Sequence, residues 1–155
     1  MYQSITTSLY TFENIREKDI FYADKTDFFH RLVTDASGIF FLSRPRRFGK
    51  SLSVSILKNI FKGNKELFNG LRIYDMPYDW NPYPVINLNI SKADCSSAEE
   101  LNRGLCIILH DNAHELGIEL SSETKSGYLF GELIDKAKDL SKVVILIDEY
   151  DKPLV

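Results

Sequence analysis

The sequence predicts an α/β fold in which helices flank a parallel sheet in three layers. Short segments typical of strands occur at residues 39–42, 85–90 and 143–147, the first and last of them apolar runs and the middle one alternating. Between them lie longer stretches in which apolar residues recur every three or four positions, the spacing of amphipathic helices. The resulting order, strand–helix–strand–helix–strand, is typical of a parallel sheet with helical crossovers.

In the N-terminal half, helical spacing first appears over residues 25–34, after the potential N-terminal caps Asp24 and Thr26. The apolar run Ile39–Leu42 then predicts a buried strand. Residues 51–61 follow as an amphipathic helix. Apolar residues near 67–71 indicate one more short helix.

In the C-terminal half, residues 75–84 contain three prolines and predict a loop. "VINLNI", residues 85–90, alternates as a strand does. Residues 97–116 predict the clearest helix, with Leu101, Leu105, Ile108 and Leu109 on one face. A second helix is expected over 124–139. "VVILI", residues 143–147, predicts a strand buried on both faces.

Composition narrows the class of protein. The 155 residues suit about one domain, and 44% hydrophobic with 26% charged residues is typical of a globular chain. A net charge of −3 argues against a module that binds nucleic acid through overall positive charge. Neither a secretory signal nor an 18-residue apolar span is present, so we expect a cytoplasmic protein without a membrane segment. Cys95 and Cys106 fit no zinc or disulfide pattern and are expected to be reduced and half-buried.

Residues 43–52, "SRPRRFGKSL", concentrate four basic side chains between a predicted strand and a predicted helix. A helix N-terminus has amides without intrahelical partners and attracts anions. Gly49 would let the backbone approach a phosphate closely. Lys50 could reach the outer phosphates, and Ser51 could place its hydroxyl on Mg²⁺. The stretch therefore predicts a phosphate-binding loop.

The match to the phosphate-loop consensus is incomplete. Gly49, Lys50 and Ser51 fit it, but Arg44 stands where the first glycine belongs. Pro45 holds Arg44 in the extended region, so the turn could form without that glycine. The alternative is a basic, solvated turn between strand and helix.

An acidic pair follows the last predicted strand in "VVILIDEYD", residues 143–151. Asp148, at the carboxyl end of the strand, could hold Mg²⁺, and Glu149 could orient or deprotonate an attacking water. The alternative is that both acids cap the next helix. Because ligands bind at the carboxyl ends of parallel strands, the loop and the acidic pair together favour a nucleotide site.

With both motifs in view, the chain resembles the AAA-ATPase-like family of bacterial proteins. These are P-loop NTPase-type ATPase domains, often followed by a restriction-endonuclease-like nuclease domain. The resemblance covers nearly the whole chain and is carried by long motifs: "FYADKTDFFHRL", "FLSRPRRFGKSL", "KELFNGLRI", "YPVINLNIS" and "LIDEYDKPL". Ala23 replaces the valine usual in the first of them.

The resemblance implies ATP and Mg²⁺ as ligands. Ser51 and Asp148 would hold the metal, and Lys50 and Glu149 would take part in catalysis. ATP would lie against the loop formed by Arg46, Arg47, Phe48, Gly49, Lys50, Ser51 and Leu52. Arg46 and Arg47 could touch phosphate or face solvent.

The resemblance also predicts what lies beyond Val155, seven residues after Asp148. In such ATPases a further strand, a polar sensor residue and an arginine finger follow the acidic strand. Residues 1–155 are thus expected to be the N-terminal portion of a P-loop domain, incomplete at its C-terminus. Nucleic acid would be a partner only through a following nuclease domain, and an oligomer is possible. The alternative function is a nucleotide-binding switch or a degenerate interaction module without turnover.

Two other patterns are interpreted structurally. His110 and His114 are four residues apart on a predicted helix, a zinc-compatible spacing, but no convincing third ligand follows. His110 is expected near the apolar face of that helix. The 18 tyrosines and phenylalanines are scattered and indicate core packing rather than a base-stacking surface.

Overall fold

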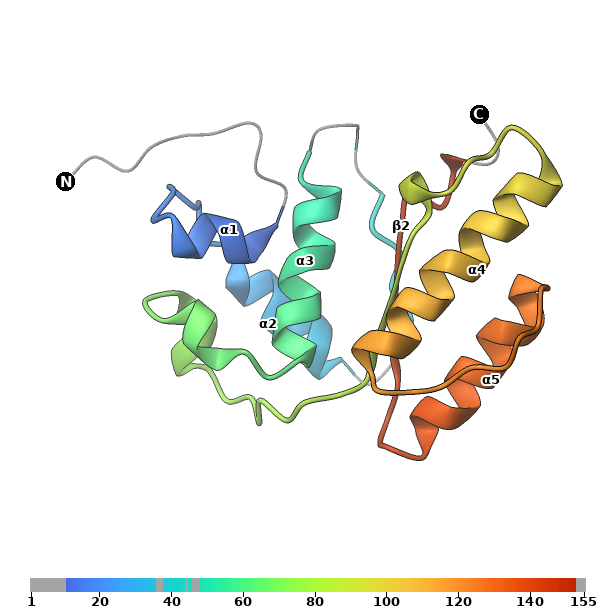
Figure 1. Ribbon diagram of the computed structural model, residues 1–155. Coiled ribbons are helices and arrows are strands. Elements are labelled where there is room, and N and C mark those ends of the chain that lie inside the picture. Colours follow the sequence, from blue (N-terminus) through green and yellow to red (C-terminus); the bar gives the residue numbers. More distant parts are fainter. Residues whose placement is uncertain (1–10, 36–37, 44, 46–47, 153–155) are drawn as a thin grey trace. The chain divides into compact units, whose positions relative to one another are not determined.

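The computed structural model describes residues 11–35, 38–43, 45 and 48–152 (Figure 1). The chain divides into two compact units, Met1–Pro82 and Tyr83–Val155. Among the described residues, no helix combines the length and the apolar character that crossing a membrane requires.

The first unit is helical in its described part. Three α-helices, α1 (Phe12–Glu17), α2 (Thr26–Thr34) and α3 (Lys50–Phe61), are followed by two 3-10 turns, η1 (Lys65–Phe68) and η2 (Arg72–Asp75). The predicted helices at 25–34 and 51–61 are confirmed. The short helix expected near 67–71 is η1, which lies slightly earlier in the chain.

An aromatic and aliphatic core holds this unit together. Phe12 of α1 packs on Phe68 with ring centroids 4.8 Å apart, and Phe68 packs on Trp80 at 5.2 Å. The buried cluster consists of Phe12, Phe29, Ile56, Ile60, Phe68, Leu71 and Ile73. It therefore draws a residue from each helix and turn of the unit.

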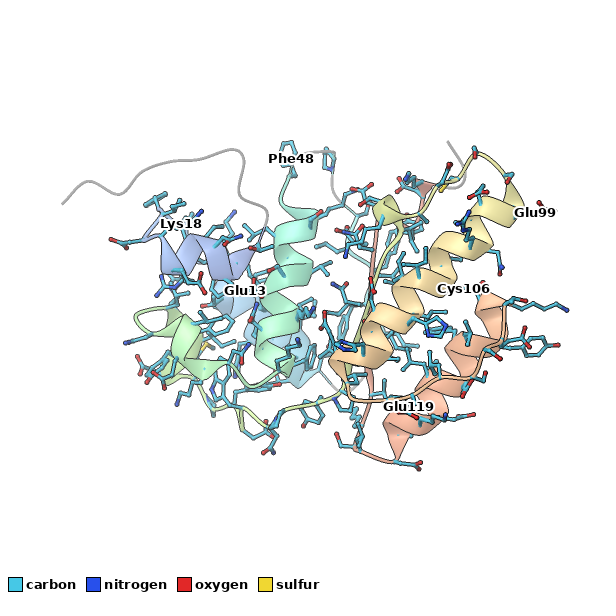
Figure 2. All side chains as sticks on the ribbon, viewed as in Figure 1. Glu13, Lys18, Phe48, Glu99, Cys106 and Glu119 are labelled. Atoms are coloured by element: carbon cyan, nitrogen blue, oxygen red, sulfur yellow. The ribbon has the colours of Figure 1, made fainter. Side chains whose placement is uncertain are left out.

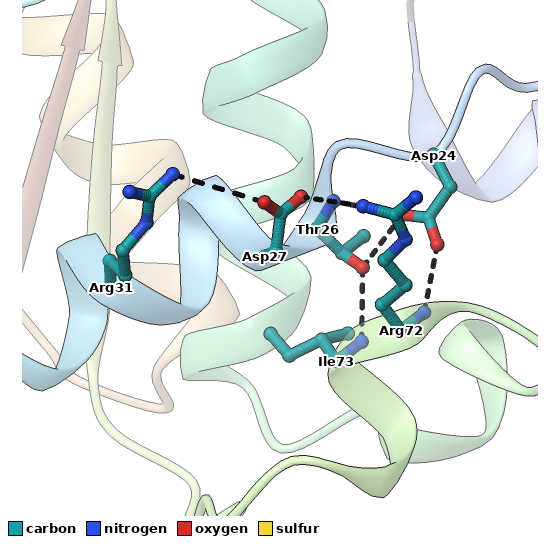
Figure 3. A network of polar contacts seen from close by, with 6 residues as sticks. All are labelled: Asp24, Thr26, Asp27, Arg31, Arg72 and Ile73. Carbon is teal, nitrogen blue, oxygen red and sulfur yellow. Dashed lines mark hydrogen bonds and ion pairs between the residues drawn. The ribbon is translucent and has the colours of Figure 1, made fainter.

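Asp24 and Thr26 fasten the start of α2 to η2 (Figure 3). The Asp24 carboxylate accepts hydrogen bonds from the backbone N–H and hydroxyl of Thr26 at 2.8 and 2.7 Å, and from the backbone N–H of Arg72 at 2.8 Å. The buried Thr26 hydroxyl in turn accepts from the Ile73 N–H at 3.0 Å. Asp24 and Thr26 thus connect α2 to η2 within this unit. The expectation that they are N-terminal caps is not met, because Lys25 is the N-cap of α2 and makes no side-chain cap bond, and Thr26 is the first residue of the helix.

The strand predicted at Ile39–Leu42 is wrong for the described chain. Residues 38–43 form no strand, and Ile39 and Phe41 are 89% and 70% exposed. An apolar run becomes a strand only when a neighbouring strand accepts its backbone hydrogen bonds. Both strands that the structure describes belong to the second unit, and they pair with each other.

The second unit has mixed α/β structure with a two-stranded parallel sheet. Strand β1 (Val85–Asn89) leads through the 3-10 turn η3 (Ile90–Lys92) into helix α4 (Ala98–Glu115). Helix α5 (Ser126–Lys138) then precedes strand β2 (Val144–Asp148). Both predicted helices, both predicted strands and the parallel direction are confirmed.

The two strands are in register from Val85 opposite Val144 to Asn89 opposite Asp148. Helix α4 packs on β1, and α5 packs beside α4 (Figure 1). The shared core consists of Ile86, Leu88, Ile90, Ala93, Ile108, Leu109, Ala113, Leu129 and Leu133. The carboxyl ends of both strands, Asn89 and Asp148, therefore lie side by side.

The prediction that residues 143–147 are buried on both faces is wrong here. Ile145 and Ile147 are 41% and 51% exposed. They pair with Ile86 and Leu88, which α4 covers. The helices of this unit cover β1 and leave the corresponding part of β2 open.

Asn112 of α4 occupies the edge of β1 that faces away from β2. Its carboxamide oxygen accepts from the Asn87 N–H at 2.7 Å, and its nitrogen donates to the Asn87 carbonyl at 3.1 Å. The same nitrogen donates to the Ile108 carbonyl at 2.7 Å. Asn112 is 7% exposed, so a buried side chain satisfies both backbone groups of a central strand residue.

Candidate functional site

The predicted phosphate loop ends in a tight turn before α3. The Phe48 N–H donates to the Pro45 carbonyl at 3.3 Å. Gly49 then has φ +76° and ψ +24°, in the left-handed region, and α3 begins at Lys50. A residue with a side chain adopts this conformation only at a cost, so the turn specifically favours glycine. No heavy atom lies within 4 Å of the position that a Cβ would take at Gly49, so the requirement is conformational rather than steric.

The first turn of α3 offers no acidic side chain to the free backbone N–H groups at the helix start. The N-cap is Gly49, which has no side chain to cap the helix, and among the described residues the first turn carries no acid. The Gly49 carbonyl accepts from both the N–H and the hydroxyl of Ser53, at 2.9 and 2.8 Å, which fixes the first turn. A rigid, uncapped helix start of this kind presents its amides and its dipole to an anion.

The side chains of the loop separate into two groups. Lys50 and Ser51 are half-buried at the start of α3, and Leu52 packs against the core of the first unit. Phe48 is 64% exposed and lies at the N-terminal end of α3 (Figure 2). Leu52 could therefore contribute its backbone N–H, but its side chain is committed to the core.

Helix α3 is held from the side by α1. The Ser55 hydroxyl accepts from the Phe12 N–H at 2.8 Å and donates to the Glu13 carboxylate at 3.0 Å. Burial alone would raise the pKa of Glu13, but hydrogen bonds from Asn59, the backbone and Ser55, with the charge of Lys58, hold that pKa below its ordinary value. Glu13 is thus an ionised anchor for the helix that carries the loop.

Arg44, Arg46 and Arg47 lie outside the described residues. The predictions that Arg46 and Arg47 contact nucleotide, and that Arg44 replaces the first glycine of the loop, stay predictions.

The predicted acidic pair lies at the carboxyl end of β2, in the second unit. Asp148 is the last residue of the strand and is 6% exposed. One of its carboxylate oxygens accepts from the Glu149 N–H at 3.1 Å. Asp148 is therefore a buried carboxylate at the strand end, in the place from which the sequence predicts metal binding.

Glu149 follows in an unusual backbone conformation. Its φ is +55°, the left-handed region that non-glycine residues seldom occupy. Such strain is typical of functional sites, where neighbouring contacts hold a residue in place. Glu149 is half-buried and directly follows Asp148, the last residue of β2.

Lys152 is a member of this region that the sequence analysis missed. Its ammonium group donates to the carbonyl oxygens of Ser91 and Ala93, at 2.9 and 2.6 Å, in the segment that follows β1. A lysine directly after Asp151 suggests a solvated side chain, and no local pattern reveals a bond to residues about 60 positions earlier.

The histidine pair lies on the exposed side of α4. His110 and His114 are both exposed on α4, so the expected position of His110 near the apolar face is wrong. Within the described ranges, no three His, Cys, Asp or Glu side chains gather as a metal cluster. The thiols of Cys95 and Cys106 are free and half-buried, as expected.

Comparison with known proteins identifies the family. The chain matches the family described as "Predicted AAA-ATPase" over residues 6–155, and it belongs to that family. It is 38% identical over 157 residues to the "Uncharacterized protein in vnfD 5'region" of Azotobacter chroococcum mcd 1. That match covers 99% of the chain and 30% of the relative, so the chain spans less than a third of the relative's length. No solved structure matches the chain.

Proposed function

We propose that this chain forms the ATP-binding part of a Mg²⁺-dependent ATPase with a three-layer P-loop fold. One observation carries the proposal: α3 begins directly after the left-handed Gly49 and has neither a side-chain cap nor an acid in its first turn. Membership of a family described as predicted AAA-ATPases supports nucleotide as the anion that this helix start would receive.

Each loop residue has a distinct proposed task. The backbone amides of Gly49, Lys50 and Ser51 bind phosphate oxygens, and the Lys50 ammonium binds the outer phosphates as charge develops there. The Ser51 hydroxyl is a ligand for Mg²⁺. Leu52 contributes its N–H and fixes the helix in the core, where its side chain packs.

The acidic end of β2 takes the complementary tasks. Asp148, buried at the strand end, binds Mg²⁺ directly or through water, and Glu149 orients the attacking water and accepts its proton. Oxygen donors of this kind fit Mg²⁺, which proteins bind through one or two carboxylates with phosphates and waters completing the shell. The metal, when bound, would neutralise negative charge on the phosphates.

The proposal is tested by nucleotide binding and phosphate release, measured on this chain and on the complete natural reading frame that contains it. Lys50→Ala should weaken ATP binding, because it removes the cation that faces the phosphates. Glu149→Gln should leave binding intact and stop turnover, because the amide cannot accept a proton.

The matched control is Lys58→Ala, which removes a lysine from the last turn of the same helix. It should leave nucleotide affinity within about twofold, because helix-end effects are confined to the first and last turns. Hydrolysis that persists in Glu149→Gln would remove Glu149 from its proposed role. Equal affinity in Lys50→Ala and Lys58→Ala would contradict a phosphate site at this loop.

A second function, a nucleotide-binding switch without turnover, is favoured by Arg44 in place of the first loop glycine. The two functions differ in one measurement. A switch binds ATP in a Lys50-dependent way but releases no phosphate in the complete protein, whereas the ATPase does both.

A further inference from the structure

The backbone of Glu149 requires support from its surroundings. Of the described residues other than glycine, Asp19, Trp80 and Glu149 have positive φ, and Glu149 lies next to the acidic end of β2. A side chain in the left-handed region is held against a steric cost, and it persists only where other contacts determine the local geometry. The question is which contacts hold Glu149.

The turn after β2 supplies two of these contacts. The Glu149 N–H donates to the Asp148 carboxylate at 3.1 Å, and the Glu149 carbonyl accepts from the Lys152 N–H at 3.1 Å. These bonds are local, and they close a short turn without attaching it to the rest of the unit.

Lys152 provides the attachment. Its ammonium group reaches from the end of this turn to two carbonyl oxygens in the segment after β1, Ser91 at 2.9 Å and Ala93 at 2.6 Å. Hydrogen bonds from a charged donor are shorter and stronger than neutral ones. Two such hydrogen bonds from one ammonium group fix the end of the turn to the segment that follows the neighbouring strand, β1.

The segment that receives Lys152 is itself fixed from two sides. The Asn89 side chain accepts from the N–H and hydroxyl of Ser91, at 3.0 and 2.6 Å. On the other side, α4 approaches so closely that a Cβ at Gly104 would lie 2.7 Å from the Ala93 Cβ. Ala93 is 2% exposed. Lys152 therefore binds a rigid part of the unit.

We propose that Lys152 is a positioning residue for Glu149. By tying the turn to the carbonyls of Ser91 and Ala93, it holds Glu149 in the left-handed conformation and sets the direction of its carboxylate. The catalytic consequence rests on the proposed function of Glu149. The conformational part stands on the contacts alone and can be measured separately.

The conformational test is a double-mutant cycle on the 155-residue chain. Lys152→Met removes the ammonium group but keeps an unbranched side chain, and Glu149→Gly removes the strain, since glycine adopts positive φ freely. Lys152→Met should lower the unfolding midpoint in both backgrounds, and by less in the wild type than in Glu149→Gly, because release of the turn also relieves the strain at Glu149. The backbone chemical shifts of residue 149 should leave the left-handed range in Lys152→Met. Equal losses in both backgrounds, or unchanged shifts, would overturn the proposal.

The catalytic test uses the complete protein. Lys152→Met should lower kcat at least tenfold with KM for ATP within about twofold, because Glu149 acts on water and not on nucleotide binding. Lys152→Arg, which keeps charge and donors, should recover much of the rate. The control is Lys142→Met, an exposed lysine before β2 that should change neither. Wild-type kcat in Lys152→Met would overturn the proposal.

The two hypotheses fail in different ways. A wild-type protein that releases no phosphate contradicts the proposed ATPase function, and the double-mutant cycle still decides whether Lys152 holds Glu149. If the wild type hydrolyses ATP normally and residues 149 and 152 show no coupling, only the proposed positioning role of Lys152 is rejected.

Discussion

At the residue scale, Gly49 is where a backbone conformation limits the choice of side chain. Gly49→Ala should destabilise the first unit by about 1 kcal/mol, because alanine in the left-handed region costs roughly 1–2 kcal/mol and recovers part of this from the unfolded chain. Urea unfolding followed by the fluorescence of Trp80, the single tryptophan, measures the effect.

Gly131 is the matched control for this substitution. It lies in the interior of α5, is exposed, and has open space around the Cβ position. Gly131→Ala should therefore stabilise its helix by about 0.5–1 kcal/mol. If both substitutions stabilise the chain, the left-handed conformation of Gly49 does not constrain the residue there.

Two carboxylates make the first unit sensitive to acid. For Asp24, as for Glu13, burial by itself would raise the pKa, but hydrogen bonds hold each pKa below its ordinary value, 3.8 and 4.5 respectively. A lowered folded-state pKa contributes stability above the unfolded pKa and loses it as pH falls through the folded value. The Trp80 urea midpoint should thus be level from pH 7 to 5 and fall below about pH 4.

The carboxamide variants separate this acid sensitivity from general charge effects. Glu13→Gln should lower the midpoint at pH 7 and flatten its decline in acid, because the proton-linked contribution is gone. Glu17 is an exposed acid on the same helix, and Glu17→Gln should show the same dependence of the urea midpoint on pH as the wild type. A Glu13→Gln profile as steep as the wild type's would place the acid sensitivity elsewhere.

At the element scale, Asn112 satisfies the outer edge of β1 from inside α4. Asn112→Leu should destabilise the second unit by about 2–4 kcal/mol, because the Asn87 N–H and carbonyl both lose their partner and each buried orphan costs about 1–3 kcal/mol. Thermal unfolding followed by far-UV circular dichroism measures this loss. Asp111→Ala, at an exposed neighbour on the same helix, should change stability by less than about 0.5 kcal/mol.

Helices with long periodic patterns could be predicted from the sequence, and short elements could not. Helices α3, α4 and α5 follow the apolar spacing closely. Helix α1 was missed because its six residues bury only Phe12 and Ile15. Turn η2 was missed because Asp24 and Thr26, nearly 50 residues earlier, fix it. The strand at 39–42 was predicted from local hydrophobicity, which says nothing about a pairing partner.

For the candidate site too, local features could be predicted from the sequence and contacts between distant segments could not. A helix start and a strand end are local features, so the positions of Gly49 before a helix and of Asp148 at the end of a strand could be expected from the sequence. The role of Lys152 could not be predicted, since its hydrogen-bond partners lie in the segment that follows the other strand, β1. The packing of the Leu52 side chain against the core of the first unit could not be read from the loop motif either.

At the scale of the whole molecule, the 155-residue chain should bind nucleotide but hydrolyse it slowly. Residues 38–43 lead into the phosphate loop without a strand ladder among the described residues, and Ile39 is 89% exposed. Phosphoryl transfer depends on accurate positioning, and an error of about 1 Å can cost on the order of 100-fold. We therefore expect slow hydrolysis where residues 38–43 are not paired in a sheet.

Phosphate release by the purified, folded chain with Mg²⁺ and ATP tests this expectation. The rate should fall well below the roughly 1–100 per second of working kinases. A rate within that range, abolished by Lys50→Ala, would mean that these 155 residues are a sufficient catalyst.

The carboxamide of Asn112 also determines which neighbours the sheet accepts. It occupies the hydrogen-bonding groups of Asn87 at the middle of a five-residue strand, so another molecule cannot use that side of β1 as a template for cross-β stacking. Growth of the sheet is thereby directed to the side of β2. In a crowded solution this one side chain would serve as protection against amyloid-like self-association, a role separate from its contribution to stability.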